Sequence, residues 1–249
     1  MNDSEGIRIN KYLSEAGFCS RREADKLLSQ RRITLNGKVP QIGTKVGPHD
    51  IVKDDRKRVG KPIQKHVYIA YNKPRGIVST TDTKGERKNI IDAIRHQKRI
   101  FPVGRLDKES EGLIFLTSDG DIVNKILRSK NNHEKEYIVT VDQPIGTGFI
   151  QKMGNGIPIL NTVTDPCFVE KMGRNRFRII LKQGLNRQIR RMCEHLGFEV
   201  KKLIRIRIMH VKLDLPTGKW RDLTSGELKE LKKLVSSSAK THDWREIRS

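Results

Sequence analysis

A short polar segment divides the sequence into two parts of unequal length. Between Lys53 and His66 the regular spacing of apolar residues is lost, and six lysines and arginines lie there together with a glycine and a proline. This composition is typical of an exposed linker, because it offers no apolar face to bury. The sequence therefore predicts a small domain at 1–53, a linker at 54–66, a larger domain at 67–235 and a disordered polar tail at 236–249.

The net charge of +22 constrains the partner more than the fold. A compact domain with this excess of positive charge repels itself unless a polyanion neutralises it, so nucleic acid is the first candidate and an acidic membrane the second. The longest apolar runs, such as 112–116, are far shorter than the roughly 20 residues of a membrane-spanning helix. The first residues are polar and carry no apolar signal region. We therefore expect a cytoplasmic protein without a membrane partner.

The sequence gives little sign of a disulfide framework or a metal site. Its three cysteines are scattered and form no CxxC pair. Asp107, Glu109 and Glu111 imitate the start of a calcium-binding loop, but its twelfth position holds Ser118 instead of a glutamate. We expect neither a metal nor a cofactor.

The first part of the chain has the pattern of two short helices followed by a small sheet. Apolar residues within 9–16 have helical spacing, and Ser20 and Glu23 form a capping box at the start of a second helix. Alternation at 33–35 leads into Asn36-Gly37, a strong hairpin signal.

Arg21 and Arg22 lie in the first turn of the second expected helix, where the helix dipole disfavours cations by roughly 0.3–1 kcal/mol each. Arginines at such a helix end strengthen a phosphate-binding site, although two solvated arginines on a surface helix are the alternative. With the Arg8 to Leu13 start and the Arg32 to Lys38 hairpin, these residues resemble the S4 RNA-binding domain over about 7–53. The resemblance makes Arg21, Arg22 and Lys26 candidate RNA contacts.

Strands dominate the second part of the chain. Expected strands lie at 67–71, 77–80, 113–117, 137–141, 177–181 and 203–213, and expected helices at 90–95, 122–127 and 187–196. Few helices alternate with these strands, so the fold class is α+β with a mixed, mainly antiparallel sheet.

A single carboxylate stands out in the segment 101–117. The pattern there is a strand, a turn that bears Gly104 and Gly112, and a second apolar strand, with Asp107 in the turn. Taken alone, a loop aspartate is usually a surface residue.

Four motifs resemble those of RNA pseudouridine synthases, in the family's order. They are Gly104-Arg-Leu-Asp107 with Ser110-Glu-Gly-Leu113, Asn72-Lys73-Pro74-Arg-Gly76, Lys135-Glu-Tyr137, and 183–192. Together with the S4-like segment, they make the chain similar to the RsuA/RluB/RluE/RluF branch over nearly its whole length. The resemblance implies a monomeric, cofactor-free isomerase that turns a uridine of 23S ribosomal RNA into pseudouridine. It also raises a second substrate, an anticodon-loop uridine of tyrosine tRNA.

The resemblance assigns roles to the site residues. Asp107 is the catalytic carboxylate, which either attacks C1′ of the ribose or removes a proton from C2′. Burial alone would raise its pKa, so a fixed cation must keep it ionised, and Arg190 matches the family motif. Tyr137 matches the tyrosine that stacks on the flipped base, and Arg105 is the candidate to fill the gap left in the RNA.

Further arginines are candidate RNA contacts. We expect Asn186 to cap the helix 187–196, which places Arg187 and Arg191 in its first half beside Arg190. Alternation at 203–208 predicts that Arg205 and Arg207 share one strand face that follows the RNA backbone.

Two other function classes compete. A non-catalytic S4-type RNA-binding or ribosome-assembly protein would not need Asp107, Tyr137 and Arg190 together. An RNA methyltransferase would need a glycine-rich loop after a strand, and Gly154-Asn-Gly156 is too short and wrongly placed.

Overall fold

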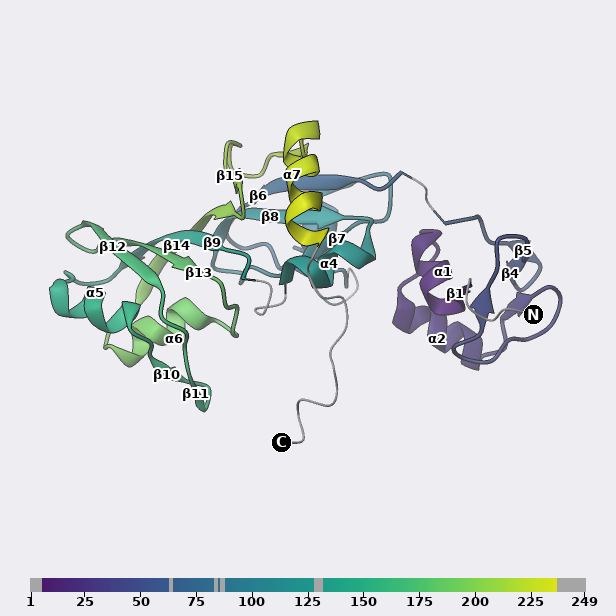
Figure 1. The fold of residues 1–249 in the computed structure, drawn as a ribbon, viewed down its shortest axis with the longest axis horizontal. Helices are drawn as coiled ribbons and strands as arrows, with labels where there is room; N and C mark the ends of the chain where they lie inside the picture. Colours follow the sequence, from purple (N-terminus) through teal and green to yellow (C-terminus); the bar gives the residue numbers. More distant parts are fainter. Residues whose placement is uncertain (1–5, 63–64, 83–84, 86–87, 128–131, 237–249) are drawn as a thin grey trace. The chain divides into compact units, whose positions relative to one another are not determined.

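The computed structural model describes residues 6–62, 65–82, 85, 88–127 and 132–236. The chain forms two compact units, residues 1–66 and 67–249, and each has its own apolar core (Figure 1). No helix among these residues has the length and apolar composition needed to cross a bilayer.

The first unit packs two helices, α1 (Ile9–Glu15) and α2 (Arg21–Ser29), against short strands. The predicted N-cap of α2 is present, because the Ser20 hydroxyl accepts a hydrogen bond from the Glu23 amide at 3.1 Å. The strands are β1 (Ile7–Arg8), β2 (Ile33–Leu35), β3 (Lys45–Val46), β4 (Val52–Asp54) and β5 (Lys57–Arg58). They form a β1–β3 pair and a β2–β4–β5 sheet, all antiparallel.

Part of the predicted linker 54–66 belongs to this first unit. Strand β5 pairs with β4, and Val59 is buried in the same core. Arg32 holds the turn between the two strands through Asp54 at 2.9 Å and Asp55 at 3.4 Å. The charged run is therefore the solvated face of a hairpin, and the predicted boundary at residue 53 is too early. Most of the predicted tail, 237–249, lies outside the described residues; Ser236 ends the last helix.

The second unit is built on one mixed sheet with the order β12-β13-β9-β14-β8-β6-β16. Its strands are β6 (Tyr68–Lys73), β8 (Glu111–Thr117), β9 (Lys135–Val141), β12 (Phe168–Gly173), β13 (Arg176–Leu181), β14 (Val200–Ile208) and β16 (Trp220–Asp222). Off this path, β7 (Phe101–Val103) pairs with β8 and β15 (Val211–Lys212) with β14, while β10 (Pro158–Ile159) and β11 (Thr162–Val163) form a separate hairpin. The β14–β8 pair is parallel and the other named pairs are antiparallel, as predicted.

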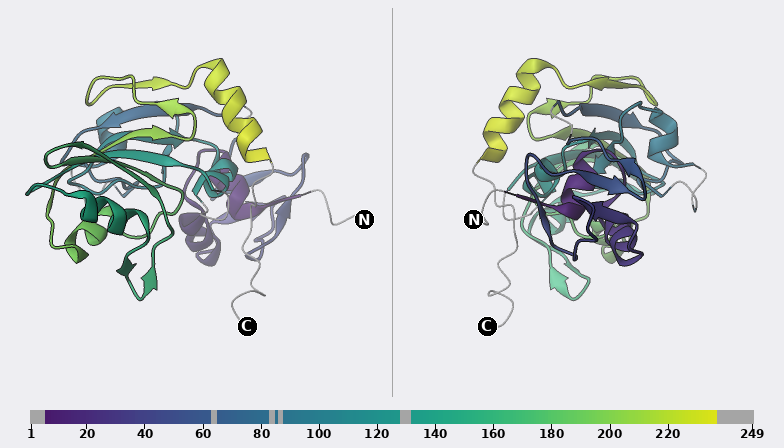
Figure 2. Two further views of the ribbon diagram at one scale, coloured as in Figure 1. Left: turned by 60° about the vertical axis from the view of Figure 1, so that its left-hand side comes forward. Right: turned by 90° about the vertical axis from the view of Figure 1, so that its right-hand side faces the viewer.

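Helices cover both faces of the sheet (Figure 2). They are α3 (Ile90–Ile94), α4 (Gly120–Leu127), α5 (Thr147–Gly154), α6 (Gln188–His195) and α7 (Ser225–Ser236). Helices α5 and α6 bury Met153 and Met192 against β9 and β13, and α4 and α7 bury Ile126 and Leu231 against β6 and β8. Helix α3 packs on the opposite face of β6 and β8 from α4 and α7. It contacts the alternate residues of these strands, because successive side chains of a strand point in opposite directions.

Gly112 lies on β8 at the point where this strand pairs in parallel with β14. Its φ is +103°, and a Cβ there would lie 2.3 Å from the Arg205 carbonyl oxygen on β14. Only glycine combines this backbone conformation with so close an approach of the two strands.

Three predicted elements differ from the structure. Residues 77–80 form no strand but a single bridge between Val78 and Asn89, because β16 already pairs along the β6 edge. The predicted strand 203–213 is a hairpin that turns at Met209, whose φ is +54°. Helix α6 begins one residue late, with Arg187 as N-cap at a φ of +49° in place of Asn186.

Candidate active site

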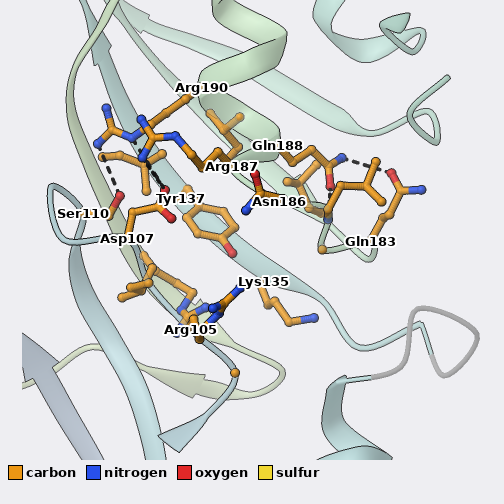
Figure 3. A pocket seen from close by; sticks show the side chains of 18 of the residues that line it. Arg105, Asp107, Ser110, Lys135, Tyr137, Gln183, Asn186, Arg187, Gln188 and Arg190 are labelled. Atoms are coloured by element: carbon orange, nitrogen blue, oxygen red, sulfur yellow. Dashed lines mark hydrogen bonds and ion pairs between the residues drawn. The ribbon is translucent and has the colours of Figure 1, made fainter. Parts of the chain in front are cut away.

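A cleft of about 430 Å³ opens on the sheet beside the first turn of α6 (Figure 3). Segments far apart in sequence line it: the β7–β8 loop, the end of α4, strand β9, the end of β13, strand β14, and α6 with the loop before it. The lining residues on which the argument below depends are Arg105, Asp107, Ser110, Lys135, Tyr137, Arg187, Arg190 and Arg205.

The β7–β8 loop holds Asp107 in place from both sides. Before it, the Ser79 hydroxyl donates to the Leu106 carbonyl at 2.8 Å and accepts from the Leu106 amide at 3.1 Å. After it, the amide of the buried Ser110 donates to the Asp107 carbonyl at 3.0 Å. The backbone is thus fixed, while the Asp107 side chain remains 32% exposed.

Two guanidinium groups face the Asp107 carboxylate. Its Oδ2 lies 3.7 Å from Arg187 Nη1 and 3.8 Å from Arg190 Nε. Arg190 is fixed in this position, because its two Nη atoms donate to the Val200 and Glu109 carbonyls and to the Ser110 hydroxyl at 3.1–3.3 Å. Its buried Nε has no hydrogen-bond partner among the described residues and is the atom that faces the carboxylate.

Burial makes Arg190 a strong electrostatic partner. Desolvation first, and the nearby Arg187 next, lower the pKa of Arg190, while Asp107 and Glu109 raise it. An arginine remains protonated under such a shift, since its unperturbed pKa is above about 12. The charge of Arg190 is therefore permanent, and it acts in a poorly screened environment where an ionised Asp107 is its natural counterion.

Arg187 is shared between two carboxylates. Its Nη1 lies 3.2 Å from Glu109 Oε2, closer than it lies to Asp107. The pKa of Glu109 is lowered, first by a hydrogen bond from its own backbone and then by Arg187. Because the Arg187 side chain is 43% exposed, it can exchange these partners for a phosphate far more easily than Arg190 can.

Tyr137 projects into the cleft from β9 and is half-buried. Figure 3 shows its ring beside Asp107, with the hydroxyl directed away from the carboxylate. A flat ring at this position offers a stacking surface for a base whose ribose lies at Asp107.

The remaining predicted arginines separate into two groups. Arg105 is exposed and lines both the cleft and an adjoining hollow next to Asp107. Arg191 turns back on its own loop, where its Nε and Nη2 donate to the Asn186 carbonyl and side-chain oxygens at 3.1 and 3.3 Å. Arg105 is thus available to a ligand, whereas Arg191 stabilises the loop that precedes α6.

The prediction that Arg205 and Arg207 share an exposed strand face is wrong. A bulge separates them on β14, so that Arg205 lies opposite Tyr137 and Arg207 opposite Glu136. Arg205 is only 3% exposed and lines the cleft. Arg207 points to the other face, where Glu136 at 2.6 Å and Glu134 at 3.1 Å neutralise it. Alternation alone could not reveal the bulge.

Two buried lysines near the site received no role from the sequence. Lys73 is fully buried and donates to the Pro74 and Ile77 carbonyls at 2.9 and 2.8 Å. Lys135 lines the cleft and is 8% exposed. Burial lowers the pKa of each lysine to about 8. Lys135 could have been found, because it lies two residues before Tyr137 on one strand and must share its face.

The candidate RNA contacts of the first unit are on its surface. Arg21, Arg22 and Lys26 are all exposed on α2. Among the described residues, no group of three or more histidine, cysteine, aspartate or glutamate side chains is arranged to hold a metal ion.

Comparison with known proteins agrees with this architecture. The model of the RNA pseudouridylate synthase family matches residues 67–195, and that of the S4 domain matches residues 7–52. The dual-specificity RNA pseudouridine synthase RluF of Shigella flexneri is 58% identical over 96% of this chain and 83% of its own length. The ribosomal large subunit pseudouridine synthase B of Bacillus subtilis is 33% identical over 92% of this chain and 96% of its own length.

A solved structure supports the same assignment. A crystal structure of a pseudouridylate synthase matches 90% of this chain and 99% of its own, with a TM-score of 0.67 and 27% identity. The family match covers more than half of the chain, and the close relatives cover nearly all of it. An S4 domain followed by this catalytic unit places the chain in the RsuA-type family of RNA pseudouridine synthases.

Proposed function

We propose that this enzyme converts a uridine of 23S ribosomal RNA to pseudouridine, with Asp107 as the carboxylate that acts on the ribose. The observation that carries the assignment is the position of the Asp107 carboxylate, at the edge of a base-sized cleft and within 3.8 Å of two guanidinium groups. The reaction breaks the N1–C1′ bond, turns the uracil and joins C5 to C1′. It consumes no water, so one carboxylate suffices where a hydrolase needs two.

The neighbouring side chains have distinct roles in this proposal. Arg190 pairs with the Asp107 carboxylate and orients it, because its own guanidinium is held in place by three hydrogen bonds. Tyr137 stacks on the extruded base, and the exposed Arg105 fills the gap that the base leaves in the RNA. Arg187 exchanges Glu109 for an RNA phosphate when the substrate binds.

The choice of RNA rests on the S4 unit and on the relatives. Arg21 and Arg22 in the first turn of α2 and Lys26 in its last turn are exposed cations that suit a phosphate backbone. The names of the RluF relatives include dual specificity, so an anticodon-loop uridine of tyrosine tRNA is the second substrate that we propose. We also propose that the enzyme acts on its RNA in the cytoplasm and as a monomer.

The decisive experiment uses ribosomal RNA that carries tritium at uridine C5, which pseudouridine formation releases to water. Wild-type enzyme should release one tritium per target site. Asp107→Asn should release none above background and still bind the RNA, because the amide preserves the shape but removes the charge. Release by this variant at the wild-type rate would remove Asp107 from the mechanism.

A second experiment identifies the target. RNA from a strain that lacks the enzyme is compared with RNA from the same strain carrying the gene, and pseudouridines are mapped in both. We expect one large-subunit site, and a tRNA site if the second substrate is correct. If every site persisted and the wild type released no tritium, the alternative of a non-catalytic S4-type RNA-binding protein would be favoured.

A further inference from the structure

Two buried cations lie side by side on the cleft face of the sheet. Lys135 and Tyr137 are two residues apart on β9, and Arg205 is the direct partner of Tyr137 on β14. Directly paired residues and i, i+2 neighbours share one face, so all three side chains point the same way. Each of them lines the cleft, although Lys135 and Arg205 are only 8% and 3% exposed.

Both cations retain unused hydrogen-bond donors. Lys135 Nζ donates to the His133 carbonyl at 3.1 Å, and Arg205 Nε donates to the Leu113 carbonyl at 2.6 Å. Arg205 Nη2 is buried without a hydrogen-bond partner among the described residues. An ammonium has three donors and a guanidinium five, so these contacts leave several donors for a ligand.

Neither cation is ion-paired with a carboxylate within the part of the chain that the structure describes. Arg207, two residues further along β14, has two carboxylates on the opposite face. The pKa of Lys135 is lowered to about 8, first by burial and then by the charge of Arg205. Two adjacent buried charges of like sign destabilise the fold, and a ligand with electronegative oxygens would offset that penalty.

The position of the pair favours the base over a phosphate. The phosphates of an extruded nucleotide remain with the RNA strand, which the exposed Arg105 and Arg187 can contact. A base that stacks on Tyr137 would lie against the strand face that carries the buried Lys135 and Arg205. The acceptors that the base would present to these two cations are the uracil carbonyl oxygens O2 and O4.

We propose that Lys135 and Arg205 bind the carbonyl oxygens of the extruded uracil and stabilise the negative charge that the base acquires when the N1–C1′ bond breaks. This inference rests on the proposed function. The electron pair of that bond leaves with uracil and is delocalised over N1, O2 and O4. The pair returns when C5 bonds to C1′, and at that point the Asp107–C1′ bond breaks or, on the other route, Asp107 returns its proton to C2′. The C5 proton is then lost to water, and N1 takes up a proton from water. Attack of Asp107 at C1′ and proton removal at C2′ both release the same anion, so the role of the cations does not depend on that choice.

The first test compares Lys135→Met with Lys135→Arg in single-turnover reactions on the tritiated RNA. Loss of one preorganised group that stabilises developing charge lowers a rate by about 10²–10³-fold. We expect a loss of this size for Lys135→Met with RNA affinity changed less than about threefold, and substantial recovery with Lys135→Arg. Arg178→Met is the matched control, since Arg178 lies on the adjacent strand β13 and pairs with Glu136 and Glu170 away from the cleft.

The second test varies the leaving base. Fluorine at C5 stabilises the uracil anion, so a 5-fluorouridine target depends less on the cations. Because C5 then carries no proton, the rate is followed as consumption of the fluorinated nucleoside at the target site. We expect the ratio of wild-type to Lys135→Met rates to be several-fold smaller for 5-fluorouridine than for uridine. A purely structural role for Lys135 would give equal ratios.

The outcomes separate this inference from the proposed function. If wild type releases tritium and Lys135→Met does so at the same rate, the cationic role is wrong and the function stands. If Lys135→Met weakens RNA affinity at an unchanged single-turnover rate, the lysine binds a phosphate instead and the inference also fails. If wild type releases no tritium, the function itself fails. Arg205→Met should repeat the Lys135→Met pattern; should it unfold because the Leu113 carbonyl loses its donor, the lysine variants decide the matter.

Discussion

The two units of this enzyme use positive charge in opposite ways. On the S4 unit, Arg21, Arg22 and Lys26 are exposed on α2. In the catalytic unit, Lys135 and Arg205 are buried at the cleft, and Arg190 is fixed by three hydrogen-bond acceptors. Exposed charges are screened by water and salt, whereas buried ones act in a medium that screens them poorly. In the function that we propose, the net charge of +22 therefore includes two kinds of cation, exposed ones that attract RNA and buried ones that act on the nucleotide.

The strongest test of this division is Arg190→Met. We expect the single-turnover rate to fall by about 10²–10³-fold, because the Asp107 carboxylate loses the fixed cation 3.8 Å away that orients it. RNA affinity should change little, since Arg190 is mostly buried. Rate and affinity are measured separately, by tritium release and by filter binding. A variant with weaker binding and a normal rate would place Arg190 among the RNA-attracting cations and break the comparison.

A second test asks whether the two units are independent in stability. Gly112→Ala should destabilise the catalytic unit by about 2–4 kcal/mol, because the methyl group meets the Arg205 carbonyl and the φ of +103° disfavours any side chain. The S4 unit has its own core and should keep its stability. Hydrogen exchange followed residue by residue measures both. Equal loss of protection in the two units would show that they unfold together.

A third test addresses the exposed cations. Replacement of Arg21, Arg22 and Lys26 by alanine should weaken RNA binding by up to about 100-fold at low salt and lower the slope of log K against log salt by about 2–3. The rate at saturating RNA should remain within about twofold of wild type. An unchanged salt slope would mean that α2 does not contact phosphate, whereas a large loss of rate would mean that these cations also position the target.

The smallest effect is a stability difference that depends on pH. The folded-state pKa of Lys135 is about 8, below its unfolded value, so the unfolded chain binds more protons between these values. Lys135→Met should therefore be more stable than wild type below pH 8, where the buried lysine carries its charge. This difference should shrink as the pH rises toward 10.5, the ordinary pKa of a lysine, where the unfolded chain also loses this proton. Lys73 also titrates in this pH range, but it does so in both proteins, so its contribution to the stability difference cancels. Chemical denaturation at several pH values gives the comparison, and a gap that widened with pH would contradict the assignment.

Local sequence patterns were sufficient to predict the features that depend on local interactions. The Ser20 N-cap, the α+β class, the mainly antiparallel sheet and the division into two units depend on periodicity, caps and composition, which can be read along the chain. The family resemblance added Asp107, Tyr137 and Arg190, which the structure brings together at one cleft.

Only the tertiary structure decided which cations face the cleft. The bulge on β14 sends Arg207 to Glu136 and leaves Arg205 buried beside Tyr137, and the left-handed backbone of Arg187 sets where α6 begins. The burial of Lys135 likewise depends on strands β13 and β14, which lie more than 40 residues away in sequence. The physical reason is that a bulge, a burial or an ion pair is a property of two strands in contact, and no single stretch of sequence contains both.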